Sequence, residues 1–421
     1  MITAHPTLKF SDFWSRRRQI LRSHFAPADL RLTYNARGAF YQLLQCVSTG
    51  GRKTILLPAF HCTALVEPVM RAGYEPIFYR LRQDFSIDLD DLRSKMSASA
   101  GFVVIVHFFG FPASEMESVL ALAHANGTLV VEDCAHSFLS HSGSHSGSHY
   151  VGHRGDFALF SYYKFAPSLA GGALGINLPE PALPNSSMRA PLGERIVITK
   201  RLVEQMAANS PQNAFSRLLL WLEKKRIDSK KSLGENPANT SPAPSSFIDD
   251  PYLFREDLAR AAMPGVCRRI LESADWAAIT TTRQKNYRLW SALLEQTSAV
   301  RRLWPRLPAS VVPWAFPVFL DDRVRHEQNL RGLGVPFFTF GEALHPALQK
   351  QADAASDDAH AISRRLIMLP VHANLTGDMI VACADIISRY FSKELPNHNH
   401  DSPDQRQETV NIARQAGGRV A

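Results

Sequence analysis

The chain has 421 residues, of which 45% are hydrophobic and 20% charged, and its formal net charge is +8. This composition is typical of a globular protein, and the length is sufficient for two domains. The positive charge is spread along the chain without a recognisable nucleic-acid-binding module, so we interpret it as solvated helix faces and expect no nucleic acid partner. The five cysteines lack a CxxC spacing, the N-terminus lacks an apolar leader, and no apolar run approaches ~18 residues, so we expect a cytoplasmic chain with reduced thiols and no membrane span.

Short apolar runs alternate with helical patterns through the first half of the chain. Residues 35–47 form a small-residue turn followed by a helix, and helices are also predicted at 62–73 and at 114–127, the latter with Ser114 as N-cap. Strands are predicted at 54–60, 75–81, 101–110, 128–137 and 156–161. Buried strands joined by helices imply a mostly parallel sheet in an α/β domain.

The composition changes after Asn177. Residues 178–228 read as an atypical, partly helical insertion with its helix at 197–228, and 229–249 read as a linker rich in Ser, Pro and Asn. Helices and then strands at 314–320 and 366–372 predict a smaller α+β unit. The sequence therefore predicts that the chain has five parts. These are an N-terminal arm at 1–29, a large domain at 30–228, the linker at 229–249, a small domain at 250–394 and a disordered tail at 395–421.

Chemistry-bearing residues stand where several of these strands end. Ligands of open α/β sheets bind beyond the carboxyl ends of the strands. Asp133 ends one apolar run, and a carboxylate there is costly to bury without a cationic partner. Lys164 follows the next strand in apolar surroundings, where an amine can form a Schiff base with an aldehyde. An acid for a pyridine nitrogen and a lysine for an aldehyde are the minimum set for pyridoxal 5′-phosphate (PLP).

A phosphate site is then required, and the turn before the first helix can supply it. The stretch "NARGAF" (35–40) opens a helix whose free N–H groups and dipole favour an anion. Many helices begin in this way, so the turn alone carries little weight.

These stretches together resemble a known family. The matching segments are "NARGAF", "ILLPAFHCTALVEPVMRAGYEPIFYRL", "SIDLDDL", "VVIVHFFGFPA", "VVEDCAHSF", "GDFALFSYYKFAPSLAGGAL" and "MLPVHANLT". In their order and spacing they resemble the DegT/DnrJ/EryC1/StrS family of PLP-dependent sugar aminotransferases, which has the aspartate-aminotransferase fold (fold type I). The resemblance runs through most of residues 30–177 and returns more weakly in 250–390.

The resemblance implies roles for individual residues. Lys164 would bind the cofactor aldehyde, seven residues before Gly171-Gly172 as in the family, and Asp133 would pair with the pyridine nitrogen. His136 falls where relatives contact the phenolic oxygen. The implied phosphate contacts are Arg37, Gly38 and Ser161.

The resemblance implies transfer of an amino group from an amino acid, with glutamate as the expected donor, to a nucleotide-linked keto-sugar in surface-polysaccharide or secondary-metabolite biosynthesis. The implied partners are these small molecules and a second copy of the chain in a homodimer. Two alternatives stay open: a non-catalytic or regulatory PLP-binding protein, and a PLP-dependent sugar dehydratase, although family dehydratases replace the lysine with histidine.

The sequence also departs from the family pattern. Cys62 stands where relatives commonly stack an aromatic ring on the cofactor, and Phe60 or His61 could replace that ring. Ser161 precedes Lys164 by three residues, where relatives commonly have five, which puts the serine's role in doubt. The unusual segment 178–249 weakens any inference about the substrate.

Two further patterns favour structural interpretations. His141, His145, His149 and His153 are four residues apart, but Ser and Gly between them argue against a helix, so we expect a loop at the mouth of the site and no metal. His61 beside Cys62 is interpreted as packing and not as a thiol nucleophile. For His107, at the end of the third predicted strand, a structural role and a role in the site are equally compatible with the sequence.

Overall fold

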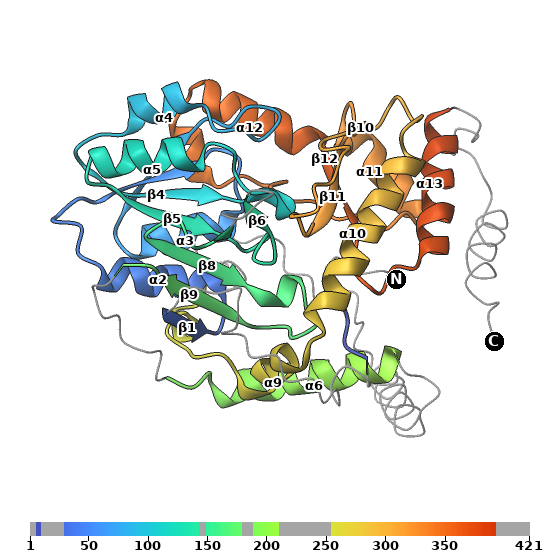
Figure 1. The fold of residues 1–421 in the computed structure, drawn as a ribbon, viewed down its shortest axis with the longest axis horizontal. Coiled ribbons are helices and arrows are strands. Elements are labelled where there is room, and N and C mark those ends of the chain that lie inside the picture. The colour runs from blue at the N-terminus through green and yellow to red at the C-terminus, as the bar shows by residue number, and fades with distance from the viewer. Residues whose placement is uncertain (1–5, 10–28, 143–148, 179–187, 210–253, 393–421) are drawn as a thin grey trace, which may run out of the picture.

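The computed structural model describes residues 6–9, 29–142, 149–178, 188–209 and 254–392 (Figure 1). The predicted linker and tail lie outside these residues, and so does most of the predicted N-terminal arm. Among the described residues, no helix has both the length and the apolar character needed to cross a bilayer.

A seven-stranded sheet forms the larger part of the molecule. Its order is β1-β9-β8-β5-β4-β2-β3. Strands β2, β3, β4, β5 and β8 pair in parallel, and β9 is antiparallel to both of its neighbours. The strands are β1 Asp29–Thr33, β2 Thr54–Pro58, β3 Glu75–Tyr79, β4 Ala100–Val106, β5 Leu129–Asp133, β8 Phe157–Ser161 and β9 Gly172–Ile176. The α/β prediction with a mostly parallel sheet is confirmed.

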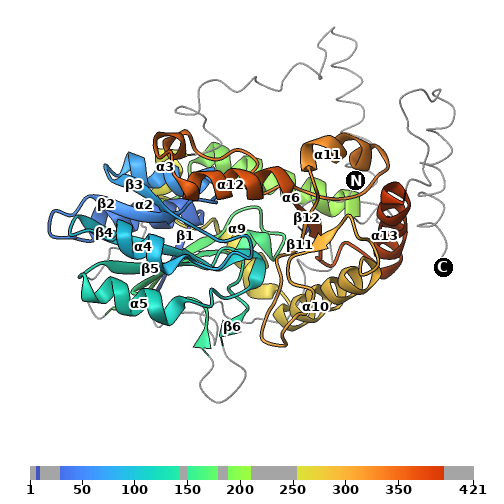
Figure 2. The same cartoon turned by 90° about the horizontal axis from the view of Figure 1, so that it is seen from above.

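Helices cover both faces of this sheet (Figure 2). α2 and α3 pack together on one face, and α4 and α5 lie on the other, as right-handed crossovers require. These helices are α2 Ala36–Cys46, α3 Thr63–Arg71, α4 Leu89–Lys95 and α5 Met116–Ala125. Because the chain crosses one way from β2 to β3 and the other way from β3 to β5, helices cover both faces of the sheet. The inner strands β2, β4 and β8 are accordingly buried along their whole length and mostly apolar.

A smaller α+β unit follows, as predicted. Its antiparallel sheet has the order β10-β11-β12, with β10 Arg301–Arg302, β11 Ala315–Phe319 and β12 Leu366–Pro370. The remaining helices are α6 Leu192–Asn209, α8 Glu256–Ala259, α9 Gly265–Ser273, α10 Trp276–Leu293, α11 Arg323–Gly332, α12 Ala354–Arg365 and α13 Gly377–Phe391, and the single-turn 3₁₀ helices are η1 Phe108–Gly110, η2 Tyr162–Lys164 and η4 Pro346–Lys350. Figure 1 shows α10 and α13 packed side by side against this second sheet.

Several predicted boundaries were wrong for local reasons. Helix α5 begins at Met116 with Glu115 as its N-cap, because the Ser114 hydroxyl donates to the Glu115 carboxylate instead of capping the helix. Helix α6 begins at Leu192 and not at 197, and its predicted extension to 228 lies outside the described residues. Strands β1 and β9 were missed, since β9 reads GALGI, with two glycines, and β1 reads DLRLT, which is half polar.

The histidine-rich loop is a hairpin at its base. β6 His141–Ser142 pairs with β7 His149–Tyr150 in antiparallel fashion, and the tip at 143–148 lies outside the described residues. The backbone N–H of His141 donates to the carbonyl of Ser310, which ties the hairpin to the loop before β11. The hairpin base places His141 and His149 on paired strands and not on a helix.

Candidate functional site

Asp133 and Ser161 end neighbouring parallel strands at the carboxyl edge of the sheet. Asp133 lies opposite Leu159 in the pairing of β5 with β8, so Ser161 extends two residues further along the same edge. Lys164 follows at once in η2, a single 3₁₀ turn. The structure therefore brings the predicted acid and lysine to one edge, on adjacent strand ends.

Asp133 is a carboxylate with one oxygen engaged. Its Oδ1 accepts from the amide of Ala135 at 2.9 Å, and within the described part of the chain no hydrogen bond reaches its Oδ2. Burial raises the pKa of Asp133, and the positive charge of Lys164, the Ala135 amide and His107 oppose that shift without cancelling it. Such a group suits a cationic ligand that offers it a hydrogen bond.

Lys164 and His136 share an aromatic neighbour that the sequence did not indicate. The Nζ atom of Lys164 lies 4.9 Å from the centroid of the Trp314 ring. The imidazole of His136, 3% exposed, stacks on the same ring at 4.0 Å with an interplanar angle of 11°. Trp314 directly precedes β11, so the smaller unit contributes to the candidate site. In the sequence, the apolar run at 314–320 is the one signal near Trp314. That run predicts a strand, and it does not predict that Trp314 contacts Lys164.

The turn before α2 lies beside the Lys164 segment. Asn35 caps the helix, and its side chain accepts from the Gly38 amide at 2.8 Å, so that predicted phosphate donor is already engaged. The α2 first turn contains no acidic residue, and Arg37 is partly exposed there. The N-terminus of α2, with no acidic residue in its first turn, fits an anion.

The Gly-Gly pair joins this turn to the lysine. The Gly171 amide donates to the Tyr34 carbonyl at 2.8 Å, and the Tyr162 amide donates to the Gly171 carbonyl at 2.9 Å. A Cβ on Gly172 would lie 2.3 Å from the carbonyl carbon of Asn35, which only glycine permits. Ser161 pairs with Gly172 across β8 and β9, so Ser161 lies near the turn despite its short spacing to Lys164.

Phe60 and His61, which could replace a stacking aromatic at position 62, are both buried. Cys62 caps α3 and is partly exposed, whereas Phe60 is fully buried. His61 lies within 2.8 Å of the Ala59 carbonyl through Nδ1 and accepts from the His345 amide through Nε2. Burial lowers the pKa of His61 to about 4, so this neutral, fully engaged imidazole is a structural residue.

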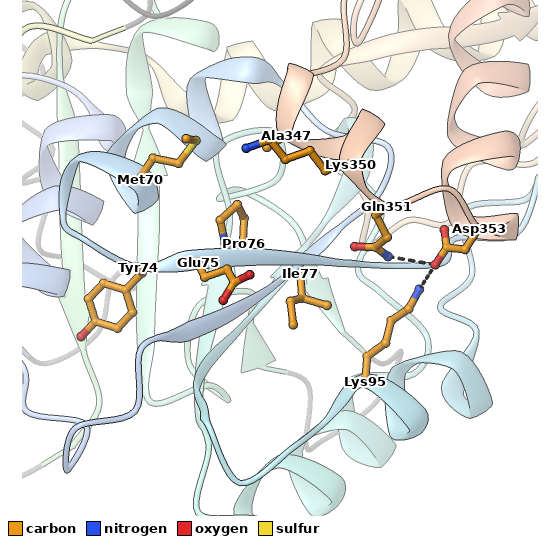
Figure 3. A pocket seen from close by; sticks show the side chains of 10 residues that line it. All are labelled: Met70, Tyr74, Glu75, Pro76, Ile77, Lys95, Ala347, Lys350, Gln351 and Asp353. Atoms are coloured by element: carbon orange, nitrogen blue, oxygen red, sulfur yellow. Dashed lines mark hydrogen bonds and ion pairs between the residues drawn. The ribbon is translucent and has the colours of Figure 1, made fainter.

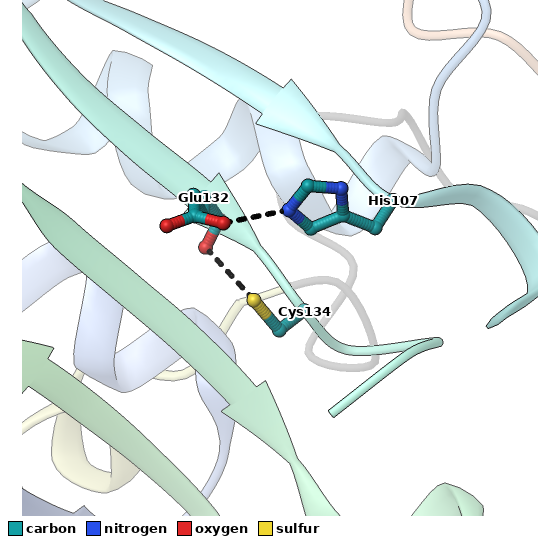
Figure 4. Close-up of side chains that lie close together, drawn as sticks. All are labelled: His107, Glu132 and Cys134. Atoms are coloured by element: carbon teal, nitrogen blue, oxygen red, sulfur yellow. Dashed lines mark hydrogen bonds and ion pairs between the residues drawn. The ribbon is translucent and has the colours of Figure 1, made fainter. Parts of the chain in front are cut away.

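His107 is also a structural residue (Figure 4). Its Nδ1 accepts from the Ala113 amide, so Nε2 carries the proton and donates to Glu132 at 2.8 Å. Glu132 further accepts from the amides of Gly152, Arg154 and Gly155. With Cys134 these side chains lie close enough to hold a metal ion, but both His107 nitrogens are already bonded, which favours a hydrogen-bonded brace for the hairpin base.

A pocket of about 600 Å³ lies at the far edge of the sheet, outside the outermost strand β3 (Figure 3). The Gln351 amide group bonds both the N–H and the carbonyl of Phe78, and the Lys95 amine pairs with Asp353 at 2.7 Å. These side chains satisfy one another and cap an edge strand, so we assign this pocket no chemistry.

Comparisons with known proteins agree with this geometry. Residues 32–182 match the model of the DegT/DnrJ/EryC1/StrS aminotransferase family. The chain is 29% identical over 133 residues to a UDP-N-acetyl-3-dehydro-alpha-D-glucosamine 3-aminotransferase of Acidithiobacillus ferrooxidans, a match that covers 31% of this chain and 34% of that protein. It is 27% identical over 130 residues to the GDP-perosamine synthase of Escherichia coli O157:H7, with the same coverage of 31% and 34%. The matched region thus spans about a third of the length of these curated relatives.

The likeness of fold extends much further than the likeness of sequence. The structure of Helicobacter pylori PseC, an aminotransferase involved in the biosynthesis of pseudoaminic acid, aligns with 92% of this chain and 98% of its own at a TM-score of 0.62 and 15% identity. The fold is that of the PLP-dependent transferases of fold type I, with Asp133 and Lys164 at the carboxyl edge of its large sheet. In residues 32–182 the chain is therefore similar in sequence to the DegT/DnrJ/EryC1/StrS aminotransferase family, and it has the fold of a solved aminotransferase along most of its length.

Proposed function

We propose that this chain is a PLP-dependent aminotransferase that moves an amino group from glutamate to a keto-sugar carried on a nucleotide. The observation that carries the proposal is the placement of Asp133 and Lys164 on adjacent strand ends, beside a helix N-terminus free of acids. Two relatives carry the names of a UDP-linked and a GDP-linked sugar, and these names support a nucleotide-linked keto-sugar as the acceptor. Lys164 argues for amino transfer over dehydration.

The residues present fit PLP. The free Oδ2 of Asp133 offers an acceptor for a protonated ring nitrogen, and the partly exposed amine of Lys164 lies near enough to lower the Asp133 pKa through its charge. The start of α2 offers amides to a phosphate. Bound PLP would supply an electron sink for the carbon that carries the transferred amino group.

The chain's own groups would perform the remaining work. Asp133 would hold the cofactor's ring nitrogen in its charged form. When the amine of Lys164 is not bound to the cofactor, it would act as a general base and take the proton from the donor carbon. It would then act as a general acid and donate that proton to a different atom. His136 and Trp314 present a flat, water-poor surface beside that amine, which limits competing hydrolysis.

The absorbance of the purified protein tests the proposal. With PLP the chain should show a band at about 330–430 nm that shifts on addition of glutamate, and borohydride should fix the cofactor to Lys164. Lys164→Ala should abolish both the shift and turnover with a keto-sugar nucleotide. Lys53→Ala is the matched control, since the Lys53 amine also lies over a ring, that of Tyr74 at 4.6 Å, but before β2 at the opposite end of the strands.

Each result has a distinct meaning. A protein that takes up no PLP would refute the proposal. A band that forms but does not respond to any amino donor would favour the non-catalytic PLP-binding alternative. We also propose a homodimer, which sedimentation velocity of the full chain would test.

A further inference from the structure

Arg283, on α10, is a buried cation without an acidic partner. It is 1% exposed, and no carboxylate in the described part of the chain pairs with it. Burial lowers the pKa of its guanidinium to about 9. Because a long apolar side chain would fill the same space without desolvating a charge, the retained arginine needs an explanation.

The guanidinium of Arg283 binds two segments of main chain. Nη1 donates to the carbonyls of Pro313 and Trp314 at 3.2 and 2.9 Å. Nη2 donates to the carbonyls of Lys164 and Phe165 at 3.0 and 3.4 Å. The guanidinium carbon also lies 4.5 Å from the centroid of the Phe165 ring. The planar guanidinium presents several N–H donors in a fixed fork and can serve both pairs of carbonyls at once, which the single ammonium of lysine cannot do.

The two segments lie far apart in sequence and meet at the candidate site. One carries the amine of Lys164, and the other carries the ring of Trp314 on which that amine lies. The Trp314 amide donates to the carbonyl of Phe109 at 2.8 Å. Hydrogen bonds therefore fix the Trp314 backbone both at its amide and at its carbonyl, which accepts from Arg283. Arg283 is therefore the side chain that links the backbone of Lys164 to the backbone of Trp314.

We propose that Arg283 is a positioning residue that sets where the Lys164 amine lies relative to Trp314 and His136. It touches none of the reacting atoms. Its guanidinium fixes the carbonyl of Lys164 and the carbonyl of Trp314 to one rigid group, and so it limits the positions open to the amine. The catalytic consequence rests on the proposed function, whereas the positioning itself does not.

Two variants and one matched control test this proposal in the full chain. Arg283→Met removes all the donors at similar length, and Arg283→Lys keeps a charge but not the fork. Asn286→Leu is the control, because Asn286 is a buried polar residue on the same helix that donates to the carbonyls of Val371, His372 and Leu375 within the smaller unit only.

Hydrogen exchange provides the first readout and needs no cofactor. In both Arg283 variants, exchange in peptides covering 160–168 and 312–316 should rise by about tenfold or more, with little change elsewhere. In Asn286→Leu the rise should be confined to the region of 369–376. A rise spread equally over the smaller unit in the Arg283 variants would overturn the proposal, because it would show a general structural role.

The second readout separates cofactor affinity from the chemical step. In Arg283→Lys the apparent Kd for PLP should stay within about threefold. The rate at which glutamate changes the absorbance of the loaded protein should fall by about 100-fold, the scale of a misplacement near 1 Å. An unchanged rate in the loaded fraction would overturn the catalytic consequence. If the wild-type chain takes up no PLP, the proposed function fails, and hydrogen exchange still decides whether Arg283 positions Lys164.

Discussion

The buried carboxyl group of Asp133 lowers the stability of the folded chain when it is ionised. Burial raises the pKa of this carboxyl group in the folded chain above its usual value. Below the usual carboxyl range both states are protonated and the group has no effect. As the pH rises through that range the unfolded chain ionises first, so folding becomes less favourable, and the loss persists at neutral pH. The nearby charge of Lys164 reduces the loss without removing it.

Asp133→Asn should therefore stabilise the cofactor-free chain and abolish the proposed aminotransferase activity. The asparagine oxygen can still accept from the Ala135 amide, and the buried charge is gone. We expect a higher urea midpoint at pH 7 than in the wild type, with the difference vanishing near pH 3. Turnover should fall by roughly 10²-fold or more, because a neutral amide cannot hold the ring nitrogen protonated. Urea titrations at several pH values and turnover assays measure the two effects.

Asp156→Asn is the control for this pair of effects. Asp156 is a buried acid that accepts from the Val130 amide at 2.7 Å and pairs with His124, at the other end of the same strands. Its substitution should leave turnover unchanged and should not raise the urea midpoint. An active Asp133→Asn enzyme would contradict the role we propose for Asp133.

Between elements, the important connection runs from η2 through β9 to the start of α2. The backbone of Gly171 forms hydrogen bonds with the backbones of Tyr34 and Tyr162, and Gly172 packs against the backbone of Asn35. The Gly-Gly pair thus holds the lysine turn and the proposed phosphate turn in contact. Its spacing after Lys164 has a structural cause, namely the length of chain needed to leave η2 and begin β9.

Gly172→Ala should break this connection. The new Cβ would lie 2.3 Å from the Asn35 carbonyl carbon and 2.4 Å from the Ala36 nitrogen, both backbone atoms that cannot rotate away. We expect the free energy of unfolding to fall by about 1–3 kcal/mol or more, from overpacking against rigid atoms. The affinity for PLP should fall with it, because the α2 turn is displaced. Urea unfolding and PLP titration measure both quantities.

Gly193→Ala is a matched glycine substitution in helix α6. A Cβ there meets no atom within 4 Å, so the variant should be neutral or more stable by up to about 1 kcal/mol. If Gly172→Ala behaves like Gly193→Ala, the contact between β9 and α2 is looser than described here.

The elements that the sequence predicted best are those with the simplest packing. The apolar runs at 54–60 and 156–161 became β2 and β8 with ends shifted by two residues or fewer, since strands buried on both faces carry a continuous apolar signal. β9 gave no such signal, because it contains two glycines, and one of them, Gly172, is required by the close approach of the backbone at the start of α2. Asp133 and Lys164 could be found because Asp133 ends β5 and Lys164 follows closely after the end of β8. Trp314 and Arg283 could not, because only the folded chain brings α10 and the start of β11 to Lys164.

At the scale of the whole molecule, an aromatic cluster joins the two sheets. The Phe85 ring lies 4.9–5.4 Å from the rings of Phe60, Phe108 and Phe109 on the large-sheet side. It also lies 5.8 and 6.4 Å from Trp304 and Phe319 of the smaller unit. One continuous core includes large-sheet residues together with Trp314 and Phe340. The smaller unit therefore cannot unfold without exposing aromatic surface of the larger one.

The wild-type chain should consequently unfold in a single transition, and Phe85→Ala should uncouple the two parts. Removing this ring should lower the free energy of unfolding by about 3–5 kcal/mol and leave a gap between the two sheets. Four of the six tryptophans lie in the smaller unit, so fluorescence weights that unit more heavily than far-ultraviolet circular dichroism does. The two urea midpoints should coincide in the wild type and separate in Phe85→Ala. Phe102→Ala is the matched control: Phe102 is fully buried in β4 and its ring packs on Tyr74, within the larger unit. That variant should lose a similar free energy with coincident midpoints, because the junction is intact. Separate midpoints in the wild type would show that the cluster does not couple the two units.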